Sequence, residues 1–96
     1  MAVFLISYDL NSPGQKHDKI DSALKAVGGI RIMESCWLIE EHLKPMHPME
    51  LRDALLKTFI DDNDILFVTR VHQFDFSSWN LTPEQDVWLN NPMLAW

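Results

Sequence analysis

An α+β fold in one domain is predicted by three features of this sequence. Short apolar runs rich in β-forming residues alternate with two segments whose apolar residues recur at helical spacing. Pro and Gly residues stand at the boundaries between these segments, where they start and stop helices. The length of 96 residues matches about one domain, and 47% hydrophobic with 23% charged residues is ordinary for a globular chain.

The first strand and the first helix are predicted by the opening third of the chain. Residues 3–8 form a continuous apolar run that ends at Asp9, which is typical of a central strand covered on both faces. Ser12 can cap a helix in which Pro13 occupies the first position and Gln15 completes a capping box. The apolar stripe of this helix consists of Ile20, Ala23, Leu24 and Val27, and Gly28 and Gly29 end it.

The middle of the chain predicts more strands and a second helix. Residues 30–41 have a β-like pattern, either as two strands (30–33 and 36–40) with a tight bend between them or as one long bent strand. Pro48 suits the first position of the second helix. Its stripe consists of Leu51, Ala54, Leu55, Thr58 and Phe59. An acidic turn at residues 61–64 then leads into a strand at residues 65–71.

The resulting order, strand–helix–strand–strand–helix–strand, is that of the ferredoxin-like split βαβ arrangement. We therefore expect sheet order 4-1-3-2 with both helices on one face, over a core of about residues 1–72. The extension of about residues 73–96 contains three of the four tryptophans. It is predicted to hold a short strand and a short helix that starts with the capping signal at residues 82–85. This aromatic extension covers either the second sheet face of its own chain or a partner subunit.

Charge and composition narrow the classes of function. The net charge of −6 disfavours strong, non-specific binding to nucleic acid, which relies on clusters of Lys and Arg. No apolar run approaches the roughly 20 residues of a membrane span, and no basic leader precedes the first apolar stretch. The single Cys36 excludes an internal disulfide and is typical of a small buried hydrophobe in a reducing compartment. We expect a cytoplasmic protein with no membrane partner.

The predicted topology brings carboxylates together at one edge of the sheet. In order 4-1-3-2, the end of the first strand lies beside the starts of the third and fourth, which groups Asp9, Ser35 and residues 61–64. Carboxylate oxygens are ligands for Mg²⁺ or Mn²⁺, which could activate water or stabilise charge on a phosphoryl oxygen. The alternative is structural, since Asp and Asn are also common in solvated turns.

Other motifs point to no chemistry. The four histidines lack the spacing of a zinc site, and no P-loop, G-x-S-x-G or G-x-G-x-x-G sequence occurs. Lys16 and Lys19 share the first helix with Asp18 and Asp21, which indicates a solvated face of mixed charge.

Three stretches of the chain carry a resemblance to a known group of proteins. They are Ile6-Ser7-Tyr8-Asp9-Leu10, Arg31-Ile32-Met33-Glu34-Ser35-Cys36-Trp37, and the turn and strand at residues 61–68. With these stretches the sequence resembles the small CRISPR-associated ferredoxin-like proteins of spacer acquisition. It looks closer still to their SinR-like relatives outside CRISPR loci, and is more distantly similar to virulence-associated protein D.

The resemblance implies a homodimer with a metal ion, Mg²⁺ or Mn²⁺, held between two copies of Asp9. That aspartate supports metal-dependent nuclease activity in some of these proteins and is dispensable in others. By the same resemblance Arg31, Ser35 and Tyr8 are phosphate or backbone contacts. Trp37 stands where the group usually has Phe, and with Phe74, Phe76 and Trp79 it is expected to pack at the dimer interface. The group's paired arginines early in the first helix are replaced here by Lys16 and Asp18.

Two functions follow from the sequence. One is a metal-dependent endonuclease that hydrolyses RNA or DNA with Asp9 as the catalytic metal ligand. The other is a non-enzymatic dimeric module of a toxin–antitoxin or defence locus, which binds a protein partner through its acidic surface. The resemblance favours the first function and the net charge favours the second.

Overall fold

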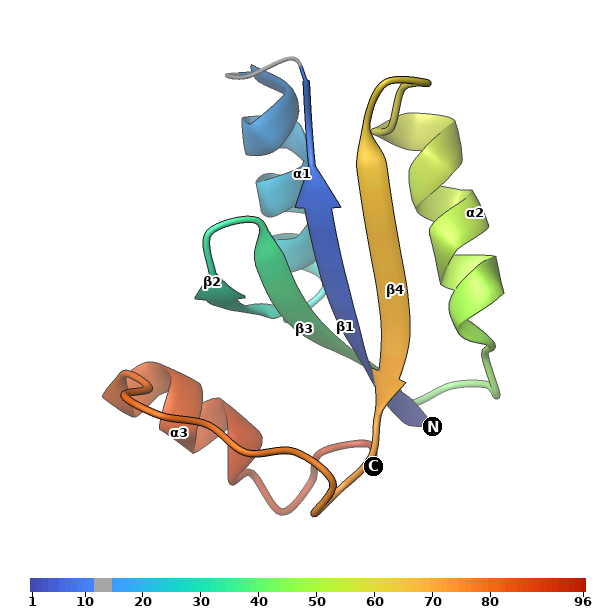
Figure 1. The fold of residues 1–96 in the computed structure, drawn as a ribbon. Helices are drawn as coiled ribbons and strands as arrows, with labels where there is room; N and C mark the ends of the chain where they lie inside the picture. The colour runs from blue at the N-terminus through green and yellow to red at the C-terminus, as the bar shows by residue number, and fades with distance from the viewer. Residues whose placement is uncertain (12–14) are drawn as a thin grey trace.

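Seven elements follow one another in the part of the chain that the computed structural model describes, residues 1–11 and 15–96. They are β1 (Ala2–Asp9), α1 (Gln15–Ala26), β2 (Ile30–Met33), β3 (Cys36–Glu41), α2 (Pro48–Thr58), β4 (Ile65–Val71) and α3 (Pro83–Leu89) (Figure 1). The predicted βαββαβ order is confirmed, with one further helix after it. The predicted capping residues Ser12 and Pro13 lie outside the described residues.

The four strands form one antiparallel sheet in the order β2-β3-β1-β4, as predicted. Of the two alternatives for residues 30–41, the structure has two strands, because the chain turns back at Ser35 with a φ of 60°. β1 is central, with Ile6 opposite Trp37 of β3 on one side and Val68 of β4 on the other. β2 and β4 are the two edges of the sheet.

Both α1 and α2 cover the same face of the sheet, as predicted (Figure 1). The core there is built on the alternate residues of β1 that point to this face, because successive side chains of a strand point to opposite faces. Its buried members are Ala2, Phe4, Ile6, Tyr8, Leu10, Ile20, Leu24, Trp37, Ile39 and Leu55. Phe4, Ile6 and Ile20 are fully buried, so the core is least exposed where the central strand meets α1.

The second face of the sheet is partly covered by the end of the same chain. Leu94 and Ala95 are buried, and the amide of Ala95 donates to the Glu40 carboxylate at 3.1 Å. Glu40 pairs with Val3 in the ladder, and Val3 is fully buried although it points away from the two large helices. The extension therefore packs on its own chain at this end of the second face.

The extension differs from the prediction before its helix. No strand forms among residues 72–82, all of which are described. The amide of Asp75 instead donates to the carbonyl of His72, and Phe74 and Asn80 have positive φ angles of 67° and 60°, which strands do not contain. The predicted short strand is thus wrong, because tight turns interrupt this segment.

The helix boundaries mostly follow the local signals. Thr82 and Gln85 form the predicted capping box of α3, and Pro48 opens α2. After α1, Gly28 has a φ of 82° and its amide closes a turn to the carbonyl of Lys25. No described helix is both long enough and apolar enough to cross a membrane.

The two predicted apolar stripes are only partly buried. Val27 lies in the turn after α1 and is 61% exposed, since the helix ends one residue earlier. On α2, Leu55 is buried whereas Ala54 and Thr58 are exposed, so the covered stripe is narrower than predicted.

Candidate functional site

Asp9 ends the central strand on the face away from α1 and α2. It is exposed, and its Cα is paired with that of Ile65 in the ladder between β1 and β4. One ladder position further along this face, Ser7 is paired with Phe67. Ile65 is 64% and Phe67 61% exposed. Asp9 therefore stands beside an exposed apolar part of the second face, beyond the part that the extension covers.

The predicted grouping at this end of the sheet is present in the backbone. The amide of Tyr8 donates to the carbonyl of Ser35 at 3.1 Å, so the β2–β3 turn lies against the end of β1. Asp9 pairs with Ile65, which follows the acidic turn directly. Asp9, Ser35 and residues 61–64 thus lie at one end of the sheet.

Within the acidic turn, Asp64 organises the backbone. One of its carboxylate oxygens accepts from the amide of Asn11 at 2.8 Å, and the other accepts from the amide of Asp61 at 2.8 Å. The side-chain amide of Asn11 donates to the carbonyl of Asn63. These bonds join the segment after β1 to the segment before β4, which is a structural role for Asp64.

A metal ion at Asp9 needs more ligands than its own neighbourhood supplies. Within residues 1–11 and 15–96, no three side chains of Asp, Glu, His or Cys gather around a metal-sized space. A divalent cation takes about six oxygen ligands, some of them water. The fit of Asp9 to Mg²⁺ or Mn²⁺ therefore depends on a carboxylate from a second copy of the chain.

Arg31 lies on the opposite face of the sheet from Asp9. It is paired with Trp37, which points toward α1, and its guanidinium is 3.8 Å from the Asp21 carboxylate. Asp9 points to the other face, as Ser7 does. The structure thus brings Ser35 but not Arg31 to the end of the sheet where Asp9 stands.

Tyr8, Asp21 and Trp37 form a hydrogen-bond network between the sheet and α1. The Tyr8 hydroxyl donates to Oδ1 of Asp21, and the Trp37 indole Nε1 lies 3.1 Å from the same oxygen and 3.2 Å from the Tyr8 oxygen. Burial raises the pKa of Tyr8 strongly, and the hydrogen bond to Asp21 and the charge of Asp21 raise it further. The hydrogen bonds of the Tyr8 hydroxyl are thus made to Asp21 and Trp37 within the chain.

The part of Asp21 in this network was not predicted from the sequence, which placed Asp21 on a solvated face of mixed charge. Its side chain is only 28% exposed and accepts from two buried donors. The sequence feature that could have indicated this role is the position of Asp21 beside Ile20, at the margin of the buried stripe of α1. A carboxylate at such a margin reaches into the core where donors lie opposite.

The four predicted interface aromatics lie in different environments. Trp37 is 5% exposed and belongs to the core of its own chain, so little of its side chain is left for a dimer contact. Phe74 and Trp79 are 91% and 87% exposed, whereas Phe76 stacks on Trp96 with ring centroids 5.5 Å apart. Phe74 and Trp79 remain available to a partner.

Cys36 and two of the histidines, His42 and His47, have structural surroundings. Cys36 is buried in β3, as expected of a small hydrophobe, and burial raises the pKa of its thiol. A buried thiol with a raised pKa is a poor nucleophile. His42 Nε2 lies 2.9 Å from a carboxylate oxygen of Glu40, and His47 caps α2 through Nδ1.

No protein-family model matches this chain, and no solved structure is significantly similar to it. The description of the α+β fold and its sheet order therefore rests on the structure of this chain alone.

Proposed function

We propose that this protein is a homodimeric, divalent-metal-dependent endonuclease in which the Asp9 carboxylates of two subunits share the metal ion. The observation that carries the proposal is the position of Asp9. It is an exposed carboxylate at the end of the central strand, beside the exposed apolar residues Ile65 and Phe67. The sequence resemblance to CRISPR-associated ferredoxin-like proteins supports the same residue.

The apolar residues near Asp9 support the dimer. β4 is an edge strand, and an uncovered edge with apolar side chains is a surface on which other chains associate. A second copy that covers Ile65 and Phe67 would bring its own Asp9 to the same region. Carboxylates about 4–7 Å apart could share one ion, given oxygen–metal distances of about 2–2.6 Å.

Each residue at this end of the sheet has a defined part in the proposal. Mg²⁺ or Mn²⁺, when bound, would supply stabilisation of the charge on a phosphoryl oxygen. Asp9 would hold the ion, and Ser35 would orient the backbone at the end of β1. Arg31 is on the other face and would contact only a substrate strand that extends around the β2–β3 turn.

The test is cleavage of single- and double-stranded RNA and DNA with Mg²⁺, Mn²⁺ or a chelator. We expect wild-type cleavage that requires the divalent ion and falls at least about a hundredfold in Asp9→Asn. Asp18→Asn is the matched control, since it removes an exposed carboxylate of α1. Equal cleavage by Asp9→Asn and wild type, or no metal-dependent cleavage by wild type, would reject the proposal.

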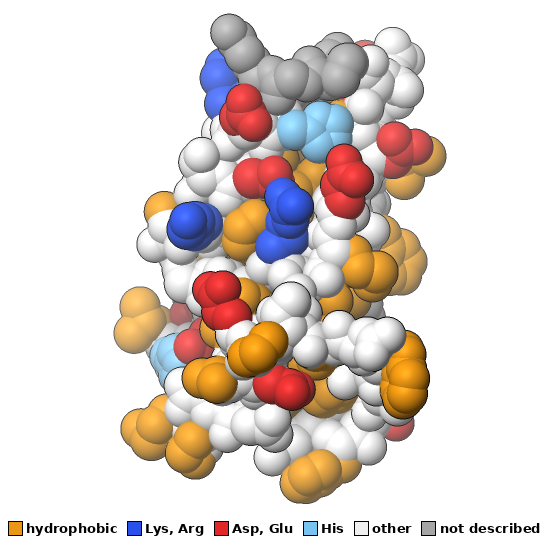
Figure 2. All heavy atoms as spheres, turned by 90° about the vertical axis from the view of Figure 1, so that its left-hand side faces the viewer, with side chains coloured by type: hydrophobic (Ala, Val, Ile, Leu, Met, Phe, Trp, Pro, Cys, Tyr) orange, Lys and Arg blue, Asp and Glu red, His pale blue; other side chains and the backbone are white. Residues whose placement is uncertain are grey.

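A second function is favoured by the net charge of −6. The chain could be a non-enzymatic dimeric module that binds a basic protein partner through its acidic surface. Figure 2 shows acidic side chains interspersed with the basic ones on the face that it views, so Lys and Arg form no continuous track there. A dimer without cleavage, together with salt-sensitive capture of a basic protein, is the outcome that favours this module.

A further inference from the structure

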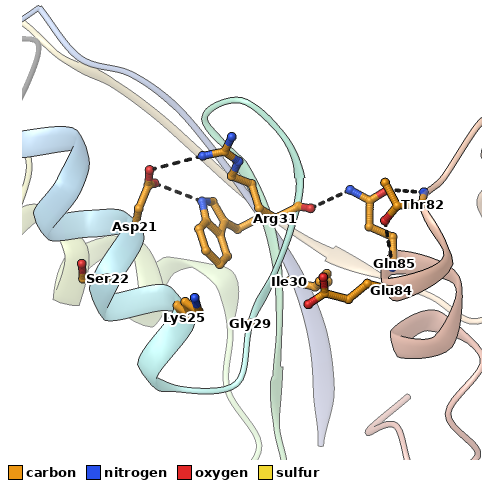
Figure 3. A pocket seen from close by; sticks show the side chains of 10 residues that line it. Asp21, Ser22, Lys25, Gly29, Ile30, Arg31, Thr82, Glu84 and Gln85 are labelled. Carbon is orange, nitrogen blue, oxygen red and sulfur yellow. Dashed lines mark hydrogen bonds and ion pairs between the residues drawn. The ribbon is translucent and has the colours of Figure 1, made fainter.

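A cleft of about 460 Å³ lies between α1 and α3, away from Asp9 (Figure 3). Its volume is in the range of sites for small molecules. The α1 wall is formed by Asp21, Ser22 and Lys25, the floor by Gly29, Ile30, Arg31 and Trp37, and the α3 wall by Thr82, Glu84 and Gln85. Of these lining residues, only Arg31 has a part in the function proposed above.

The floor of the cleft is fixed by close packing and hydrogen bonds. Trp37 is buried, and its indole N–H is held by Asp21 and Tyr8. A Cβ at Gly29 would come within 2.7 Å of the Leu24 carbonyl oxygen, so only glycine allows the backbone to approach α1 this closely.

The α3 wall is attached to the edge of β2. The side-chain amide of Gln85 donates to the carbonyls of Arg31 and Ile32 at 2.8 and 3.1 Å. The indole N–H of Trp88 donates to the carbonyl of Gly28 at 3.0 Å. The two walls therefore keep their separation without a ligand, which lowers the cost of binding.

The cleft carries charged side chains of both signs on its two walls and its floor. Lys25 projects from α1 and Glu84 from the first turn of α3, both toward the space between the helices (Figure 3). Neither is in an ion pair with another described residue. The Arg31 guanidinium is 55% exposed, and its 3.8 Å separation from Asp21 is longer than a hydrogen bond. The cleft thus has Lys25 on its α1 wall, Arg31 on its floor and the Glu84 carboxylate on its α3 wall.

This arrangement discriminates between ligand classes. The lining holds two basic and two acidic residues, so a multiply charged anion such as a nucleotide would be repelled by Glu84. A zwitterion satisfies both walls, with its carboxylate toward Lys25 and Arg31 and its ammonium toward Glu84. Ile30 offers an apolar surface between the two charged ends.

We propose that the cleft binds a small zwitterion of the α-amino acid or short-peptide class, with an apolar side chain. The bound carboxylate would accept charge-assisted hydrogen bonds from Lys25 and Arg31, and the bound ammonium would donate to Glu84. The hydroxyls of Ser22 and Thr82 are further polar groups on the two walls.

The test is titration of the wild-type chain with leucine and with the dipeptide alanyl-leucine. Binding is measured by calorimetry and by the changes in amide chemical shifts. We expect saturable binding with shifts centred on Ile30, Arg31 and Gln85. Binding of the dipeptide but not of leucine assigns the cleft to peptides, and the reverse assigns it to free amino acids. No saturable binding of either probe would overturn the proposal.

Variants of the two walls test the orientation. Lys25→Met and Glu84→Gln should each weaken binding about tenfold or more, because each leaves one ligand charge unpaired. Lys57→Met, an exposed lysine at the end of α2, is the matched control and should bind as wild type does. N-acetyl-leucine lacks the ammonium, so it should bind to the wild type more weakly than leucine does. In Glu84→Gln, leucine and N-acetyl-leucine should bind with equal affinity. Unchanged affinity in both wall variants would overturn the proposal even if leucine binds.

Discussion

The two edges of the sheet are treated in different ways by the same chain. At the β2 edge, α3 lies alongside, and Gln85 donates to two backbone carbonyls of the strand. At the β4 edge, Ile65 and Phe67 are 64% and 61% exposed. A free strand edge promotes association with other chains. The comparison teaches that the extension covers the β2 edge within the chain and leaves apolar side chains of β4 exposed.

The largest effect is expected from removing the protection of the β2 edge altogether. Truncation after Asp75 deletes α3 and uncovers Val3, and it also removes Leu94 and Ala95, both buried. Burial of a leucine contributes about 1.5–3 kcal/mol, and each hydrogen bond adds about 1 kcal/mol. We expect the melting temperature, followed by circular dichroism, to fall by about 15 °C or more.

A matched pair of point variants tests the packing of the end of the extension without truncation. Leu94→Ala should destabilise by about 2–4 kcal/mol, since it leaves a cavity. Met93→Ala alters a neighbour that is 77% exposed and should be nearly neutral. Equal melting temperatures for the truncated chain and the full chain would show that the extension does not pack on the sheet.

The next effect concerns the network beside the β2 edge and appears at high pH. The pKa of Tyr8 is raised in the folded chain by burial first, and then by its hydrogen bond to Asp21 and the charge of Asp21. The contribution of this group to stability is full below the unfolded pKa of about 10 and declines above it, where only the unfolded chain ionises. Tyr8 is the sole tyrosine, so phenolate absorbance reports on it alone.

We expect the phenolate of the folded chain to form only well above pH 10. Tyr8→Phe should make the alkaline loss of stability shallower. Both measurements belong on a Cys36→Ala background, because burial also raises the pKa of that thiol and gives a loss of the same sign. Phenolate formation at the ordinary pH in the folded chain would show that Tyr8 is neither buried nor bonded to Asp21.

A smaller effect is expected from weakening the β2 edge at one side chain. Gln85→Ala removes both bonds to the β2 carbonyls and one half of the capping box, in which Thr82 N donates to Gln85 Oε1 at 2.9 Å. The expected loss is about 1–2 kcal/mol in the free energy of unfolding, measured with urea. Val87→Ala, on the same helix and 72% exposed, is the control. A loss in Gln85→Ala no larger than in this control would mean that α3 does not hold the edge.

The features that local chemistry decides could be predicted from the sequence. The capping box at Thr82, the turn at Gly28 and the apolar run of β1 each act over a few residues, and the topology follows from their order. The Asp21 network could not be predicted, because it depends on how α1 is rotated against Tyr8 and Trp37. The exposure of Phe67 could not be predicted either, since the apolar run at the start of β4 has the pattern of a strand that is covered on both faces.

The smallest effect on stability is expected at the β4 edge, where the protection is absent. Phe67→Lys places a charge on a side chain that is already 61% exposed, so the free energy of unfolding should change by about 0.5 kcal/mol or less. The effect on association should be large, because a lysine on an edge strand opposes pairing with another chain. We expect light scattering to give a dimer for the wild type and an 11.2 kDa monomer for Phe67→Lys.

The control is Phe74→Lys, a change at a 91% exposed aromatic of the extension, which tests whether the loss of any exposed aromatic would disrupt the dimer. A monomeric wild type would remove the dimer from the proposed function. A dimer that survives Phe67→Lys but not Phe74→Lys would move the interface from the β4 edge to the extension.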